Sequence, residues 1–118
     1  MRRYLVAGNW KLNMGPAAGA ELAQAVSNLL QGRELKGDVL VCPPYVSIPA
    51  VAGVAAGNPV MTGAQNCADQ DSGAYTGEVS PSMLKEAGAR YVIVAHSERR
   101  EYQRETDDQF VAKIKLIH

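Results

Sequence analysis

Residues with reactive side chains follow two short apolar runs of strand type. Asn9 and Lys11 come shortly after the run at 4–7. Parallel α/β folds place their active sites at the carboxyl ends of strands. Lys11 could supply a fixed positive charge for an anionic substrate, with Asn9 as a hydrogen-bond donor beside it. The alternative is a solvated lysine and a turn asparagine, because loops are rich in both residue types.

The segment from His96 to Arg100 comes directly after the run at 91–95. If a helical turn begins at Ser97, His96 lies at the positive end of the helix dipole, which disfavours the charged imidazolium. A neutral imidazole could donate a proton to a substrate, although a histidine that only caps the helix would look the same. Glu98 beside Arg99 is more typical of a surface ion-pair network than of an acid–base pair.

A third notable segment is the sequence Gly73-Ala74-Tyr75-Thr76-Gly77-Glu78, which follows Gln65-Asn66-Cys67. The connection is longer than an ordinary link between strand and helix, and long ordered loops often have a function. Its glycines predict tight turns that project Tyr75 and Thr76 outwards. The pair would then contact another subunit or remain in solvent.

Strand-type runs alternate with helical segments along the whole chain. The runs are Tyr4–Ala7, Val39–Cys42, Val60–Gln65 and Tyr91–Ala95, and helices are predicted to begin at Pro16, Ser47, Ser80-Pro81 and Thr106. This rhythm predicts a parallel sheet with right-handed crossovers. Periodicity does not decide between a doubly wound sheet and part of a (βα)₈ barrel.

The apolar spacing within these helices predicts which faces are buried. Spacings of three and four residues favour burial of Leu22, Ala25, Val26, Leu29 and Leu30 in the first helix, of Ile48, Val51, Ala52 and Ala55 in the second, and of Phe110, Val111, Ile114 and Ile117 in the last. Gly88 offers a left-handed stop to the short third helix. Thr106 and Gln109 form a predicted capping box at the start of the last helix.

Composition narrows the function classes. The 118 residues are 47% hydrophobic, enough for one domain spanning 1–118, and 12 basic residues balance 12 acidic ones, which disfavours nucleic acid as a partner. The apolar stretch Leu5–Ala7 is too short for a signal peptide or a membrane span, so we expect a soluble, cytoplasmic protein. Cys42 and Cys67 lack metal-site spacing and are expected to be small buried hydrophobes.

Four motifs together resemble triosephosphate isomerases, in the order and with the spacing of that family. They are Gly8-Asn9-Trp10-Lys11-Leu12-Asn13, Ala64-Gln65-Asn66, Gly73-Ala74-Tyr75-Thr76-Gly77-Glu78 and His96-Ser97-Glu98-Arg99-Arg100. The resemblance extends from Met1 to about Ile114. It implies a (βα)₈ barrel enzyme of glycolysis and gluconeogenesis that interconverts dihydroxyacetone phosphate and glyceraldehyde 3-phosphate without metal or organic cofactor.

The resemblance also assigns roles to individual residues. Lys11 would bind the substrate phosphate with help from Asn9, and His96 would be the neutral electrophile, a role inherited from the family. Glu98 would neighbour Lys11, and Ser97 would support the site. Thr76, with Tyr75 beside it, would reach across a dimer interface to support Asn9 and Lys11 of the other subunit. Ala95 departs from the family, because many relatives have glycine there, and its methyl group could crowd the substrate.

A complete barrel of this kind needs about 250 residues, so we expect this chain to form a parallel (βα)₄ half of it. The missing half would carry the glutamate general base, the lid and the late phosphate-binding loops. Two functions are therefore considered. The chain could be an isomerase half that is inactive until it meets a complementary C-terminal half, or a non-catalytic half-barrel that self-assembles into a dimer or tetramer.

Overall fold

The computed structural model describes residues 2–118 and contains one four-stranded parallel sheet in the order β1-β2-β3-β4. The strands are β1 (Tyr4–Asn9), β2 (Gly37–Cys42), β3 (Val60–Ala64) and β4 (Tyr91–Val92). Val39 pairs with Val6 on one side and with Val60 on the other. The sheet therefore adds one neighbouring strand per βα unit, which is how a barrel is built and not how a doubly wound sheet is ordered.

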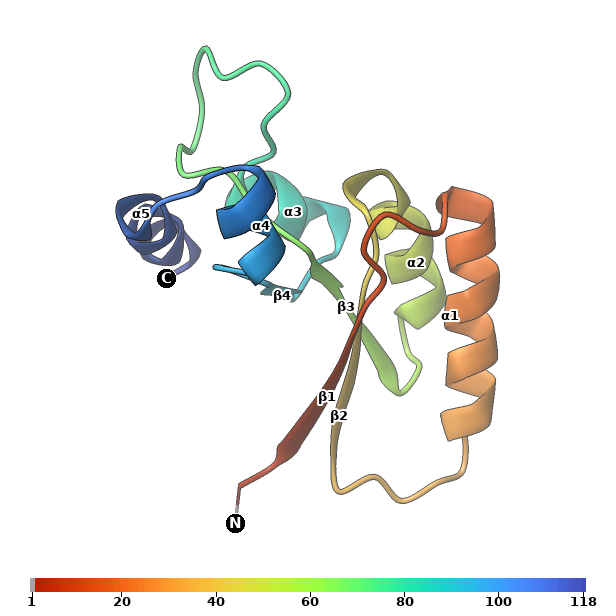
Figure 1. Cartoon of the computed structure of the whole chain (residues 1–118). Coiled ribbons are helices and arrows are strands. Elements are labelled where there is room, and N and C mark those ends of the chain that lie inside the picture. The colour runs from red at the N-terminus through yellow and green to blue at the C-terminus, as the bar shows by residue number, and fades with distance from the viewer. Residues whose placement is uncertain (1) are drawn as a thin grey trace.

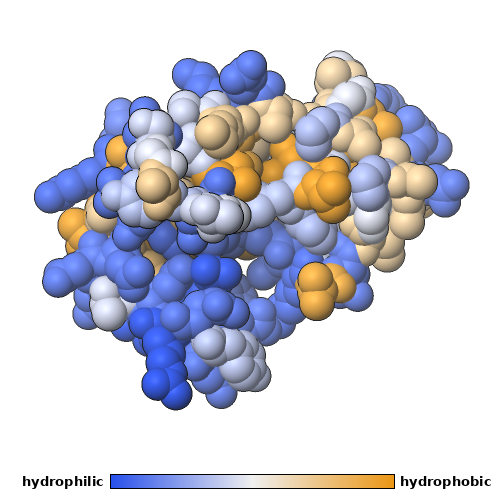
Figure 2. Space-filling model, turned by 90° about the horizontal axis from the view of Figure 1, so that it is seen from above, coloured by the Kyte–Doolittle hydropathy of each residue, from blue (hydrophilic) through white to orange (hydrophobic). Residues whose placement is uncertain are grey.

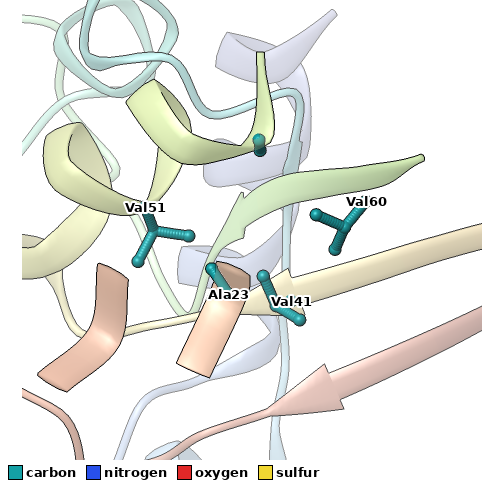
Figure 3. Close-up of a cluster of buried hydrophobic side chains, with 5 residues drawn as sticks. Ala23, Val41, Val51 and Val60 are labelled. Carbon is teal, nitrogen blue, oxygen red and sulfur yellow. The ribbon is translucent and has the colours of Figure 1, made fainter. Parts of the chain in front are cut away.

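Residues 2–118 contain five α-helices, of which the first three connect the strands and the last two follow β4. They are α1 (Pro16–Leu30), α2 (Ile48–Ala55), α3 (Pro81–Ala87), α4 (Ser97–Tyr102) and α5 (Asp107–Ile117), and a 3₁₀ turn (Tyr45–Ser47) precedes α2. Helices α1 and α2 lie side by side on one side of β1–β3 (Figure 1). Between them and the sheet is a buried cluster that includes Ala23, Val41, Val51 and Val60 (Figure 3).

The buried face of α1 differs from the predicted one. Its buried residues are Gly19, Ala23 and Ser27. The predicted residues Leu22, Val26 and Leu30 are half-buried, and Val26 packs against the core cluster. Ala25 and Leu29 are exposed. A side chain at Gly19 would bring its Cβ within 3.3 Å of Val51, so only small residues fit where α1 meets α2. The prediction missed Gly19, Ala23 and Ser27 because close helix packing selects small side chains, to which hydrophobic periodicity gives no weight.

Three of the helix ends have the predicted caps. Ser80 accepts a hydrogen bond from the Met83 N–H at the start of α3, and Gly88 ends that helix with a φ of 110°. Thr106 forms the predicted capping box with Gln109. Ser47 was expected to cap α2, but its hydroxyl instead donates a hydrogen bond to the Met14 carbonyl in the loop after β1.

The predictions for α5 and β4 need correction. In α5 the buried residues are Phe110 and Lys113, while the expected core residues Val111, Ile114 and Ile117 are exposed. Strand β4 ends at Val92 instead of continuing to residue 95. Only the Ile93 N–H extends its pairing, to the Ala64 carbonyl, before the chain turns through a positive φ of 64° at Ala95.

Strand β1 lies at an edge of the sheet and is open to solvent. Its residues Tyr4, Leu5 and Val6 are 68%, 50% and 65% exposed. Because successive residues of a strand point to opposite faces, β1 is uncovered on both. Within residues 2–118 no helix is both long and apolar enough to cross a membrane.

Candidate active site

Asn9, Lys11 and His96 meet at the carboxyl ends of the strands, as the sequence predicted. Asn9 ends β1, and His96 immediately precedes α4. All three line one cleft of about 230 Å³, together with Gln65 and Glu98 among others. We call it the strand-end cleft. Figure 2 views the molecule from above, at this end of the strands, and shows hydrophobic side chains gathered toward the upper right of this face and hydrophilic ones over its lower left.

Lys11 is held in an unusual backbone conformation by the strand ends around it. Its φ is 56°, in the left-handed region that non-glycine residues rarely adopt. The Lys11 N–H donates to the Asn9 side-chain oxygen at 3.0 Å, and the Lys11 carbonyl accepts from the Gln65 side chain at 2.8 Å. The Gln65 amide also donates to the Cys42 carbonyl at the end of β2. The ends of three strands therefore fix the position of the Lys11 backbone.

The Lys11 ammonium is paired with Glu98. Nζ lies 2.7 Å from Oε1, and both side chains are about half exposed. The hydrogen bond from Lys11 is the main reason why the pKa of Glu98 is lowered from its ordinary value. The structure thus places Glu98 beside Lys11, where the family resemblance put it. A phosphate that binds Lys11 would compete with a charged carboxylate.

His96 caps α4, which begins at Ser97 as predicted. The imidazole Nδ1 accepts a hydrogen bond from the Glu98 N–H at 3.1 Å. An accepting Nδ1 carries no proton, so the neutral ring holds its proton on Nε2. His96 therefore both caps the helix and can donate from Nε2, which unites the two alternatives drawn from the sequence. Ser97 itself is exposed as the first residue of the helix.

The segment with Tyr75 and Thr76 projects from the end of the molecule at which the strands' carboxyl ends lie (Figure 1). Gly73 and Gly77 have φ values of 124° and 90°, which confirms the predicted turns. Tyr75 and Thr76 are exposed and do not line the cleft of their own chain. The structure therefore leaves them available to a second molecule.

The other charged and sulfur-containing residues noted in the sequence are in ion pairs or are buried. Arg99 pairs with Glu105, and Arg100 with Asp107, as expected of an ion-pair network. Both cysteines are buried, and burial raises the pKa of the Cys42 thiol to about 11. Residues 2–118 contain no cluster of three or more histidine, cysteine or acidic side chains that could hold a metal ion.

Gln65 and Tyr45 are among the cleft residues that were not singled out as site residues from the sequence. Gln65 bridges two strand ends, and Tyr45 lines the cleft with a buried hydroxyl that has no hydrogen-bond partner in the structure. Burial raises the pKa of Tyr45 to about 12, so the phenol stays protonated. Their position directly after strands was the available signal, since Gln65 follows β3 and Tyr45 follows β2.

Comparisons with known proteins agree with this geometry. A family model described as triosephosphate isomerase matches residues 4–118. Triosephosphate isomerases of Clostridium botulinum (strain Loch Maree / Type A3) and Magnetococcus marinus are 47% and 50% identical over 115 and 114 residues, covering 98% and 97% of this chain but 46% and 45% of the relatives. The crystal structure of triosephosphate isomerase from Bartonella henselae superposes with a TM-score of 0.86 at 38% identity, covering 98% of this chain and 47% of that one.

The superposition confirms that the four strands form the N-terminal half of a barrel of this type. The chain spans about half the length of the curated relatives that it matches. The family model covers nearly the whole chain. This chain therefore belongs to the triosephosphate isomerase family, a family of isomerases, and corresponds to one half of its barrel.

Proposed function

We propose that this chain, acting as one domain, supplies half of a triosephosphate isomerase site. Lys11 and Asn9 bind the phosphate end of a triose phosphate, and the Nε2–H of His96 donates to the substrate oxygen. The observation that carries this proposal is the shared strand-end cleft, in which a fixed cation and an oriented imidazole donor lie together. The expected cytoplasmic location is part of the same proposal.

The proposed roles follow from the reaction. Moving a proton between adjacent carbons of a triose passes through an enediolate, which places negative charge on oxygens that were carbonyl or hydroxyl groups. A neutral imidazole that donates from Nε2 stabilises this charge, and the Lys11 ammonium adds a second favourable field. A backbone hydrogen bond orients the His96 ring, and the ion pair with Glu98 holds the Lys11 ammonium before substrate arrives.

The reaction also needs a base, and we propose that another polypeptide segment supplies it. Glu98 is the one carboxylate among the residues that line the cleft, and Lys11 engages it. A carboxylate whose pKa is lowered is a weaker base. A missing general base costs about 10²- to 10⁴-fold in rate, so the chain alone is expected to be nearly inactive.

Binding by this half can be tested without turnover. Inorganic phosphate titrated into the ¹⁵N-labelled chain should shift the signals of Lys11 and His96, with weak affinity because the cleft is open to water. Lys11→Met should abolish the shifts, whereas Lys36→Met, on the loop before β2, should leave them unchanged. Equal shifts in the parent chain and Lys11→Met would refute the proposed phosphate site.

A second candidate function is a non-catalytic, self-assembling half-barrel. The exposure of Tyr4, Leu5 and Val6 on the edge strand β1 favours it. A second copy could cover this surface, and the Tyr75–Thr76 loop could enter the strand-end cleft of another chain. The two candidate functions compete for β1, because a second copy that covers this edge strand leaves no free edge there for a complementary half. The Tyr75–Thr76 loop is a separate surface (Figure 1).

A further inference from the structure

Helix α4, with His96 as its N-cap, brings His96 and Glu98 to the cleft but makes few apolar contacts. None of its six residues is buried. The strand before it, β4, is only two residues long, and Ala95 turns the chain through a left-handed conformation. Hydrophobic packing is the usual means of holding a short helix, since isolated helices of this length are unstable. Another interaction must therefore keep α4 in place.

A chain of charged hydrogen bonds connects α4 to two other parts of the molecule. The Arg99 guanidinium of α4 donates to Glu105 Oε2 at 2.6 and 3.2 Å. The Lys113 ammonium of α5 donates to Glu105 Oε1 at 2.8 Å and to the Asn66 side-chain oxygen at 2.7 Å. Asn66 follows β3 and, like Arg99, lines the strand-end cleft. The chain of bonds thus begins and ends at the cleft.

Burial distinguishes this network from the other ion pairs of the molecule. The side chains of Lys113 and Glu105 are 5% and 9% exposed, whereas those of Arg100 and Asp107, a pair joining the same two helices, are 53% and 83% exposed. Buried charged pairs depend strongly on geometry, because each charge must recover its lost hydration from its partners. The network therefore resists small displacements of α4, which the exposed pair does not.

The charge state of Glu105 supports this reading. Burial raises the pKa of its carboxyl group, but hydrogen bonds from Arg99 and Lys113 outweigh burial and lower it. Both carboxylate oxygens are engaged, one by each cation. The Phe110 ring of α5 lies against Arg100, with 4.8 Å between guanidinium carbon and ring centre, and adds a second contact between the two helices.

We propose that Glu105 and Lys113 are positioning residues for the strand-end cleft. Acting through Arg99 and Asn66, they hold α4 so that the His96 Nδ1 accepts from the Glu98 N–H and Nε2 remains the donor. Neither residue touches the substrate. The inference deepens the proposed isomerase function, on which its catalytic meaning rests.

Hydrogen exchange of the ¹⁵N-labelled full chain tests the proposal. The Glu98 amide reports the bond to His96, and the Trp10 amide, which donates to the Cys42 carbonyl, reports the sheet. Lys113→Met and Glu105→Gln should each accelerate exchange at Glu98 about tenfold, the factor expected when a charge-assisted hydrogen bond is lost. The imidazole ¹⁵N signals of His96 should shift with it. Exchange at Trp10 should change less than about twofold.

Asp107→Asn is the matched control, because it removes the exposed ion pair between the same helices and should leave both amides unchanged. Glu98 exchange within about twofold of the parent in both test variants would overturn the proposal. If Lys113→Met also accelerates exchange at the Trp10 amide, the test rests on Glu105→Gln, because glutamine keeps the shape of the glutamate side chain. Loss at Trp10 in both variants would also contradict it, because the network would then hold the whole fold.

The proposed function and this inference can fail separately. In a mixture with a complementary C-terminal half, Lys113→Met should lower kcat more than it raises KM, since the substrate contacts remain. Absence of activity in the mixture with the parent chain would argue against the proposed function. The exchange result at Glu98 would still decide the positioning role.

Discussion

Two residues next to the cleft, Lys11 and Ala95, have left-handed backbone conformations with φ values of 56° and 64°. Hydrogen bonds to its N–H and its carbonyl hold Lys11 in this strained conformation, and the ion pair with Glu98 holds its ammonium. Ala95 has an exposed methyl group, so its departure from the family pattern acts on the backbone conformation just before His96. The strained residue Ala95 is part of the turn that places the His96 imidazole at the start of α4.

Replacing Ala95 by glycine should stabilise the chain. The left-handed conformation costs a non-glycine residue roughly 1–2 kcal/mol, which glycine avoids. Glycine also makes the unfolded chain more flexible, which lowers the stability of the fold by about 0.4–1 kcal/mol. We expect a net gain of about 0.5–1 kcal/mol, measured by urea unfolding. A variant less stable than the parent would show that the turn is not strained.

The residues of the cleft were largely predictable, and their bonding was not. Asn9 ends a strand, Lys11 and His96 follow strands, and the carboxyl ends of parallel strands meet at one end of a sheet. The contributions of Gln65 and Tyr45 depend on which carbonyls and cavities neighbouring strands bring within reach. Such contacts between distant residues leave no periodic trace in a sequence.

At the scale of elements, the ends of α3 and the start of α5 could be predicted from nearby residues, but the buried faces of α1 and α5 could not. Ser80, Gly88 and Thr106 act within one turn of their helices, so their caps were readable from the sequence. The buried face of α5 carries Lys113 because Glu105 and Asn66 satisfy its ammonium. Apolar spacing cannot anticipate a buried charge whose partners are distant in sequence.

The Glu105 network predicts acid sensitivity. Because the pKa of Glu105 is lower in the folded chain than in the unfolded one, its stabilisation is complete above the ordinary glutamate value of about 4.3 and is lost as the pH falls through the folded value. Stability against urea should therefore decline as the pH is lowered from 6 towards 3. Glu105→Gln should flatten this decline.

Glu98→Gln is the appropriate control for that experiment. The pKa of Glu98 is also lowered, but solvent screens its exposed pair with Lys11. Its replacement should therefore change the pH dependence less than Glu105→Gln does. An unchanged slope in Glu105→Gln would mean that other carboxylates control acid unfolding.

At the scale of the molecule, the sheet presents surfaces that invite association. Within residues 2–118, β1 and β4 each pair with a strand on one side only, and β1 exposes three large hydrophobic residues. The half-barrel itself was predicted from the family resemblance and is confirmed by the superposition. Periodicity alone could not have predicted the half-barrel, because the order of the strands in the sheet depends on the crossover connections between βα units.

We expect the chain to be oligomeric in solution. Leaving roughly 500 Å² of apolar surface wet forgoes on the order of 12 kcal/mol, which is comparable to the stability of a domain. Closed two-fold assemblies are the commonest outcome for identical chains. Light scattering should give a dimer or tetramer mass. A folded monomer at all concentrations would contradict this expectation and the self-assembly function with it.

The central claim is that this chain provides the Lys11 and His96 half of an isomerase site. The most direct measurement is triose phosphate isomerisation by the purified chain, alone and mixed with the C-terminal half of a relative such as the Clostridium botulinum enzyme. We predict negligible turnover alone and substantial turnover in the mixture, with the latter abolished by His96→Gln in this chain. Equal turnover by the mixtures containing the parent and His96→Gln chains would contradict the account.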